Sequence, residues 1–139
     1  MIDFHFELEV DIRSKEDLSD WITRIVSSEG FELGQLDFVF CGDEKLLSIN
    51  QEYLGHDTYT DIITFDYTEE ALLSGDIFIS IDRVKENSEE FKVSFFNELL
   101  RVMSHGVLHL AGYGDKKEEE KQLMRKKEDE KIKMFHVEQ

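Results

Sequence analysis

The segment from Ser94 to Gly112 limits the possible folds more than any other part of the chain. Apolar residues occupy most of the circumference of a helix drawn from about Phe95 to Ala111, so we expect this helix to be buried on nearly all sides. Ser94 can cap its start, and Gly112 can end it because glycine enters the left-handed conformation at little cost. The sequence therefore predicts a central helix around which the other elements pack.

One stripe of this helix is polar and ionisable. Glu98, Arg101, His105 and His109 follow one another at intervals of three or four residues, which places them on one face. Ionisable groups on a buried helix are costly unless they are paired or bind a metal ion. Three explanations are open for this stripe: an ion pair between Arg101 and Glu98 or a neighbour, packed core histidines, and a metal site.

The metal hypothesis has a specific form. Two imidazoles four residues apart on a helix can share one ion, and Asp115 is the next possible ligand after the chain turns at Gly112. His105, His109 and Asp115 would leave a fourth position for water, as in catalytic zinc sites. The pattern predicts one zinc ion per chain. Zinc proteases of the His-Glu-x-x-His type have Glu where this chain has Gly106, so a standard metalloprotease is not indicated.

Apolar alternation and helical periodicity divide the rest of the chain into short elements. Together they predict a single α+β domain over residues 1–139, in which a small mixed sheet of about four strands packs with helices around the His-bearing helix. The strand from Leu36 to Cys41 is expected to be covered on both faces because apolar residues occupy both of its parities. The other strands are expected near residues 4–10, 60–67 and 75–80, and the other helices near 14–30, 43–55, 80–91 and 116–135. Ser14 and Asp43 can cap the first two of these helices, and Ser80 or Asp82 can start the third.

Composition restricts the environment and the partners. The single Cys41 excludes an internal disulfide and fits a reducing cytoplasm. The first seven residues do not resemble a signal peptide, and no apolar run approaches the ~18 residues needed to cross a bilayer. A cytoplasmic protein without a membrane segment is therefore expected.

Charge is unevenly distributed along the chain. The net charge of −16 argues against simple nucleic-acid binding, which needs clustered Lys and Arg. However, residues 116–133, just after the predicted metal site, hold eight of the sixteen basic residues and only six acidic ones. This segment is either a solvated helix of alternating charge or a local exception to the acidic surface. The acidic remainder could limit unspecific RNA binding or face a basic protein partner.

Three segments together resemble a known family. His105–Tyr113 (HGVLHLAGY) resembles the signature of the YbeY family of bacterial metal-dependent endoribonucleases, also called rRNA maturation factors. Thr60–Phe65 (TDIITF) and Gly75–Ser80 (GDIFIS) resemble two further segments of that family, in the same order and at similar spacing. The resemblance extends from about residue 36 to residue 132.

The resemblance implies a function and a set of partners. It implies metal-dependent, single-strand-specific cleavage of RNA, in maturation of the 3′ end of small-subunit (16S) ribosomal RNA and in ribosome quality control. The implied partners are single-stranded RNA, ribosomal RNA and the small ribosomal subunit. It places Asp61 near the active cleft. Two alternatives are open for the base: a metal-bound hydroxide that needs none, and Asp61 or Asp76 as the general base. Asp76 could instead bond a ligand histidine, or be a carboxylate at the start of a strand.

The chain departs from the family pattern at two positions. Asp115 stands where the family usually has a third histidine ligand, and a carboxylate there adds a negative charge to the site. Leu54 stands where the family often carries an arginine. Arg101, one turn before His105, is the candidate replacement as a phosphate contact, the alternative being the salt bridge described above.

Two other functions are compatible with the same residues. The protein could be a non-catalytic ribosome-assembly module whose metal holds the fold together, in which case metal removal should unfold it. It could also be a metallohydrolase that acts on peptides or small esters, although Gly106 weighs against a protease.

Overall fold

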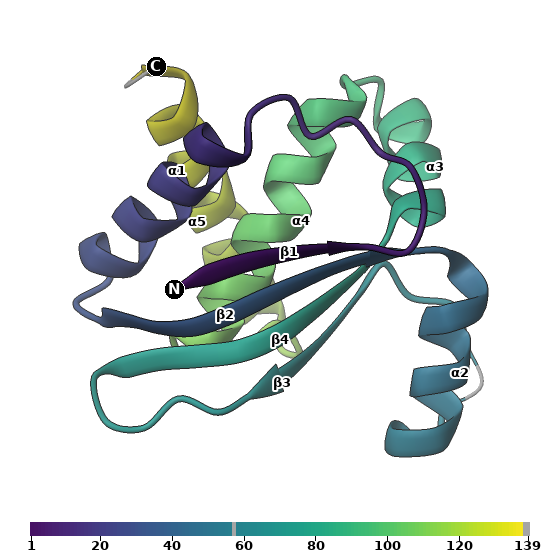
Figure 1. The fold of residues 1–139 in the computed structure, drawn as a ribbon, viewed down its shortest axis with the longest axis horizontal. Coiled ribbons are helices and arrows are strands. Elements are labelled where there is room, and N and C mark those ends of the chain that lie inside the picture. The colour runs from purple at the N-terminus through teal and green to yellow at the C-terminus, as the bar shows by residue number, and fades with distance from the viewer. Residues whose placement is uncertain (57, 138–139) are drawn as a thin grey trace.

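The computed structural model describes residues 1–56 and 58–137, and over these residues it shows an α+β fold with a mixed four-stranded sheet (Figure 1). This confirms the predicted fold class. In chain order the elements are β1 (Ile2–Phe6), α1 (Lys15–Ser28), β2 (Glu32–Cys41), α2 (Asp43–Leu54), β3 (Ile62–Asp66), β4 (Leu72–Ser80), α3 (Ile81–Phe91), α4 (Phe95–Leu110) and α5 (Glu118–Val137). Within the described residues, no helix is long and apolar enough to span a membrane.

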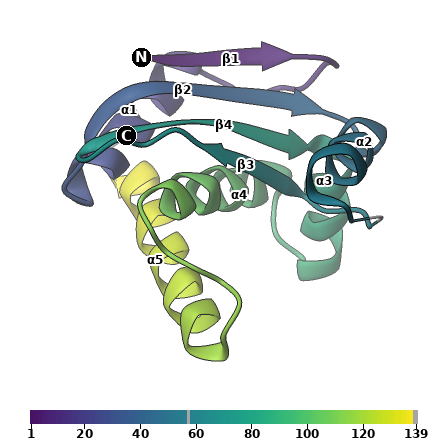
Figure 2. The same cartoon turned by 90° about the horizontal axis from the view of Figure 1, so that it is seen from below.

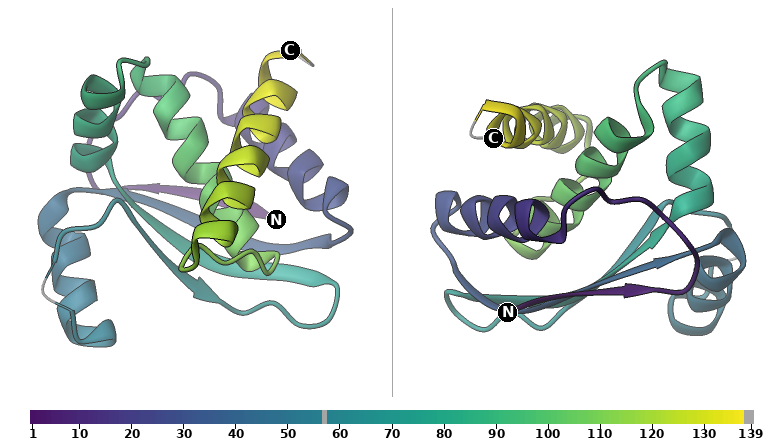
Figure 3. Two further views of the ribbon diagram at one scale, coloured as in Figure 1. Left: turned by 180° about the vertical axis from the view of Figure 1, so that it is seen from behind. Right: turned by 45° about the horizontal axis from the view of Figure 1, so that its top comes forward.

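The sheet has the strand order β1-β2-β4-β3. β1, β2 and β4 are parallel, and β3 is antiparallel to β4. Figure 2 shows α1, α4 and α5 on one side of the sheet, and both views in Figure 3 show α5 crossing α4 on that side. α2 packs against the other face at one end only, where its Leu46 and Ile49 contact Cys41 and Ile63.

α4 approaches the sheet very closely through two glycines. A Cβ atom on Gly106 would lie 2.9 Å from side-chain atoms of Ile62 and Ile77, and one on Gly75 would lie 2.9 Å from Leu110. Gly75 and Ile77 therefore face α4, and Asp76 between them faces the opposite side of the sheet because side chains alternate along a strand. This close packing fixes the height of the His-bearing helix above β3 and β4.

Three helix starts follow the capping prediction. The side chains of Ser14, Ser80 and Ser94 each accept a hydrogen bond from the backbone N–H three residues later, at 3.2, 3.3 and 3.0 Å. The fourth prediction is wrong: Gly42 is the N-cap of α2, and the Asp43 carboxylate instead accepts from Ser80 Oγ at 2.7 Å. The cap was misplaced because Asp43 finds a partner from β4 that is distant in sequence.

Two strand predictions also needed tertiary information. The first strand ends at Phe6, four residues earlier than its alternation suggested, because its pairing with β2 stops opposite Phe40. The strand from Leu36 is covered on both faces only at Cys41, under α2, while Val39 is half-buried on the open face. The prediction of full coverage is therefore wrong for most of β2.

A buried ion-pair network holds α5 against the end of α1. Lys131 Nζ lies 2.7 Å from Glu29 Oε2, and the side chains of these residues are only 2% and 8% exposed. Lys127 also pairs with Glu29, at 2.9 Å. Burial raises the pKa of Glu29, but hydrogen bonds from Lys131, Tyr113 and Lys127 outweigh it and lower the pKa to about 2. The charge of Glu29 therefore stabilises the position of α5.

Candidate metal centre

The structure brings His105, His109 and Asp115 together at the end of α4. Each imidazole has its Nε2 atom 3.3 Å from the same Asp115 Oδ2 atom, and the three possible ligand atoms lie within 4.8 Å of one another. Two ligand atoms bound tetrahedrally at usual zinc distances are separated by about 3.3 Å. The donor set and its spacing therefore fit one zinc ion without rearrangement of the backbone.

Hydrogen bonds fix which nitrogen of each histidine is free. His109 Nδ1 lies 2.9 Å from the carbonyl oxygen of Tyr113, and a carbonyl can only accept, so Nδ1 carries the proton. His105 Nδ1 lies 2.6 Å from Glu128 Oε2 and donates to that carboxylate. In the neutral rings both Nε2 atoms have lone pairs that face Asp115. Acceptors behind the Nδ1 atoms orient ligand histidines in many metal sites.

Charges around His105 favour its protonated form in the absence of an ion. Burial lowers its pKa, but the hydrogen bond that His105 donates to Glu128 and the nearby charges of Glu128, Asp115 and Asp61 outweigh burial, so the pKa of His105 is raised. The electrostatic potential at the centre is therefore negative, as expected for a cation site.

Asp61 lies beside the same centre, where the resemblance places it. It lines a cavity of about 570 Å³ together with His105, His109 and Asp115. Burial raises the pKa of Asp61, and the attraction of His105 offsets this only in part. Asp61 immediately precedes β3, which pairs with β4. Because β4 packs against α4, the start of β3 lies beside the cavity at the end of α4.

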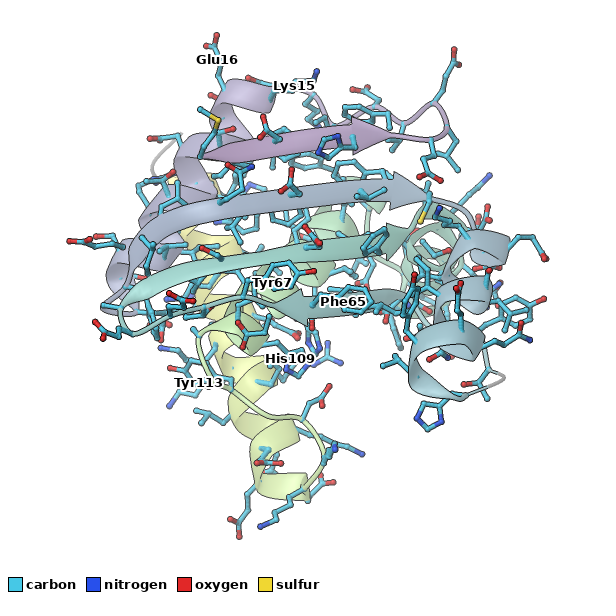
Figure 4. The ribbon with its side chains drawn as sticks, turned by 60° about the horizontal axis from the view of Figure 1, so that its bottom comes forward. Lys15, Glu16, Phe65, Tyr67, His109 and Tyr113 are labelled. Atoms are coloured by element: carbon cyan, nitrogen blue, oxygen red, sulfur yellow. The ribbon has the colours of Figure 1, made fainter. Side chains whose placement is uncertain are left out.

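Asp76 does not reach the centre, so its predicted role as a general base or partner of a ligand histidine is wrong. It lies on the open face of the sheet, where it accepts a hydrogen bond from Tyr67 Oη at 3.1 Å. In Figure 4, Phe65 and Tyr67 lie over that face, while His109 and Tyr113 lie beyond β3. The strand register decides the outcome, because Gly75 and Ile77 already occupy the parity that faces α4.

Arg101 is also not available as a phosphate contact. Its guanidinium pairs with Glu98 at 3.7 Å, Glu128 at 3.1 Å and Asp129 at 3.0 Å, and its side chain is 17% exposed. The alternative prediction of a salt bridge is confirmed. Arg101 forms an ion pair with Glu128, and Glu128 accepts a hydrogen bond from His105. The polar stripe of α4 therefore combines the candidate metal centre with an adjacent ion-pair network.

Sequence reasoning missed Glu128. The signal was available, because Glu128 lies four residues after Met124 and four before Ile132, on the apolar face of the last helix. A carboxylate on that face indicates a buried partner. Only the crossing of α4 and α5 shows that this partner is His105.

Gly106 explains the absence of a protease-type general base. It faces Ile62 and Ile77 of the sheet, and even a methyl group there would come within 2.9 Å of both side chains and force them to shift. A glutamate at this position would collide with the core instead of reaching the centre.

Comparison with known proteins identifies the family. The family model described as endoribonuclease YbeY matches residues 4–136. The chain belongs to the YbeY family. It is 51% identical to the endoribonuclease YbeY of Flavobacterium johnsoniae, with all of both chains covered, and 45% identical to that of Bacteroides thetaiotaomicron, with 89% of this chain and 90% of the relative covered.

A solved structure supports the fold. The solution structure of the Thermotoga maritima protein TM1509 is 29% identical, with a TM-score of 0.72, and covers 99% of this chain and 91% of that one. The YbeY signature at His105–Tyr113 thus lies on α4 and the following turn. In this YbeY family member, Asp115 occupies the place next to the two histidines that the resemblance assigns to a third histidine.

Replacing Glu128 with glutamine should weaken zinc binding about 10- to 100-fold, because His105 loses the carboxylate that fixes its Nδ1–H and increases its basicity. Competition with a chromophoric chelator measures the affinity. The exposed Glu119 on the same helix provides the control, since Glu119→Gln removes the same charge without contacting a histidine. Equal zinc affinities for the two variants would contradict the assigned role of Glu128.

Proposed function

We propose that this protein is a zinc-dependent endoribonuclease that cleaves single-stranded RNA. We further propose that its substrate is ribosomal RNA, and that it acts with the small ribosomal subunit in the cytoplasm, in maturation of the 16S RNA 3′ end and in quality control. Membership of the YbeY family and the name of its relatives support RNA cleavage. The convergence of His105, His109 and Asp115 beside an open cavity supports zinc dependence and is the observation that carries the proposal.

The centre is accessible to a substrate. The side chains of His105, His109 and Asp115 are 19%, 25% and 39% exposed, and they form one wall of the 570 Å³ cavity. The cavity is wide enough for a nucleotide unit, since ligand pockets commonly begin at about 300 Å³. A closed structural zinc site would have four protein ligands and no such opening.

The residues around the cavity have separate roles in the proposed reaction. His105, His109 and Asp115 would hold the zinc ion, which would supply Lewis-acid chemistry by lowering the pKa of bound water and polarising a phosphate oxygen. Asp61 serves as the general base. Burial raises the pKa of Asp61 toward neutral pH, and this suits a group that takes a proton from an attacking water. Glu128 and the Tyr113 carbonyl keep the histidines in the orientation that binding requires.

The structural-metal alternative is less favourable because the core does not depend on the centre. The three ligands come from one eleven-residue stretch, at the end of one helix and in the next turn. The main apolar cluster, which includes Trp21, Phe38 and Leu99, lies between α1, α4, α5 and the sheet without them. A metal that joins only local residues closes a short loop and contributes little to global stability.

Chelation separates the two functions. The purified protein should contain about one zinc per chain and cleave single-stranded RNA in preference to duplex RNA. Removal of zinc should abolish cleavage, shift the thermal midpoint by only a few degrees and leave the circular dichroism spectrum of a folded protein. Zinc should restore activity. Global unfolding on chelation would instead favour the structural-metal function, and cleavage of unfolded protein but not RNA would favour the peptide hydrolase.

A further inference from the structure

A second cavity adjoins the metal centre on the side of α5. It has a volume of about 270 Å³ and is lined by His105, Asp115, Lys121, Met124, Arg125 and Glu128. His105 and Asp115 also line the 570 Å³ cavity. The two cavities therefore meet at the candidate ion, which lies between them and not at the end of a single pocket.

The two cavities differ in charge. Among the described residues, the wall of the larger one contains no Lys or Arg, and it includes apolar and hydroxyl side chains such as Leu54, Ile62 and Thr58. The smaller one has Lys121 and Arg125 in its wall, beside the carboxylates of Asp115 and Glu128. Those carboxylates are already engaged, Asp115 by His105 and Glu128 by His105 and Arg101. Phosphates need cations, whereas a nucleoside can use apolar walls and hydroxyl groups. A strand that crosses the centre would thus encounter different chemistry on each side.

Lys121 and Arg125 are exposed, and the charge of Arg125 acts on the buried carboxylate of Glu98 from beyond ion-pair distance. In the part of the chain that the structure describes, neither side chain forms an ion pair, although carboxylates outnumber basic groups two to one in the sequence. Other cations nearby are engaged: Arg101 by three carboxylates, and Lys127 and Lys131 by Glu29 and Glu130. Lys121 and Arg125 lie four residues apart, so they project from one face of α5.

From this placement we infer that Lys121 and Arg125 form a phosphate subsite for the nucleotide next to the cleaved bond. The inference rests on the proposed function and extends it. The RNA strand crosses the metal centre, with one nucleoside in the larger cavity and the adjacent phosphate held over α5. Arg125 provides planar donors for two phosphate oxygens, and Lys121 adds a second charge. Lys121 and Arg125 line the other cavity from Leu54, so they provide cations at a different place from the arginine that the family often carries at that position.

Charge-matched double variants test the subsite. Lys121→Gln/Arg125→Gln removes both cations from the cavity, and Lys126→Gln/Lys133→Gln removes two exposed cations of the same helix that do not line it. Both variants have the same net charge, so any general electrostatic effect is equal. Zinc content and thermal midpoint should match the wild type in both, because neither pair touches the ligands or the core.

Binding and cleavage are then measured separately on the zinc-loaded protein. The probes are fluorescein-labelled single strands of RNA and of DNA with one sequence. The subsite variant should bind both at least tenfold more weakly near 0.1 M salt and lower kcat/KM for the RNA by a similar factor. Its slope of log affinity against log salt should fall by about 0.7, the value for the loss of one phosphate contact on a single strand. The control variant should stay within about twofold of the wild type.

The outcomes distinguish this inference from the proposed function. If the two double variants lose affinity equally, or if the wild type binds neither strand, the subsite is wrong. If the wild type binds but does not cleave, and only the subsite variant loses binding, Lys121 and Arg125 bind a phosphate of the strand but the endoribonuclease proposal fails. Arg125→Lys, which keeps the charge but loses the planar donors, should fall between the wild type and Arg125→Gln in affinity.

Discussion

Replacement of His109 with alanine is expected to remove the bound zinc and to lower the rate of RNA cleavage by about a thousandfold or more. His109 supplies one of three ligands, and its Nε2 lies 3.3 Å from the Asp115 oxygen that would share the ion. Two ligands on an exposed surface hold zinc poorly, and the reaction then loses both the activated water and the polarised phosphate. The side chain is 25% exposed, so the fold should survive its truncation.

Zinc content by mass spectrometry and cleavage of a labelled single strand measure this effect. His136→Ala is the matched control, because His136 is exposed near the end of α5, far along the helix from the centre. It should keep its metal and its activity. Asp115→Ala should resemble His109→Ala, since its carboxylate faces both histidines. A His109→Ala protein that retains one equivalent of zinc would show that the ligand set is wrong.

Replacement of Glu29 with glutamine is expected to lower the free energy of unfolding by about 3 kcal/mol at pH 7. Glu29 is the anion that compensates Lys131, whose side chain is 2% exposed. The lowering of its pKa from 4.5 to about 2 corresponds to about 3 kcal/mol at about 1.4 kcal/mol per unit. Loss of one partner from a buried pair has a comparable cost, because the other charge stays buried without compensation.

The same variant has a characteristic pH dependence. A carboxylate whose pKa is lower in the folded state stabilises the protein above the unfolded pKa, and this contribution is lost as pH falls through the folded pKa. For Glu29 the loss should occur between about pH 4.5 and pH 2. The difference in stability between wild type and Glu29→Gln should therefore shrink over that interval. Urea titrations at pH 7, 4 and 3 measure it.

Glu130 offers a control for the Glu29 prediction. It pairs with the same two lysines, at 3.1 and 3.4 Å, but its side chain is 54% exposed. Glu130→Gln should change stability by less than about 1 kcal/mol, because solvent screens an exposed pair. If both variants cost the same, or if the Glu29 difference does not depend on pH, burial is not the source of the effect.

Local sequence was sufficient for most of the helices. α1, α3 and α4 begin after Ser14, Ser80 and Ser94, where a hydroxyl can satisfy a free backbone N–H, and this preference needs no distant partner. α2 ends at Gly55 in the left-handed conformation, as its sequence indicated. Strand ends were less predictable, since a strand continues only as far as its neighbour does.

In the candidate site, too, the residues predicted from local sequence differ from those that depend on distant contacts. His105, His109 and Asp115 lie within eleven residues, so helical spacing and one turn were enough to predict that they converge. Asp61 could be placed near them only through the resemblance. Asp76 was assigned to the wrong face, because the direction of a strand side chain depends on register. The salt bridge of Arg101 was predicted correctly, but two of its partners, Glu128 and Asp129, lie on α5 and were not predicted.

The sequence by itself determined the three possible ligands, the buried helix that carries two of them and the fold class, because these depend on contacts between near neighbours along the chain. Only the tertiary structure decided which groups surround them. The crossing of α4 and α5 puts Glu128 behind His105, and it puts Lys121 and Arg125 beside the centre. Such contacts join residues that are distant in sequence, and no local pattern specifies them until the packing of apolar faces has set the distance between the two helices.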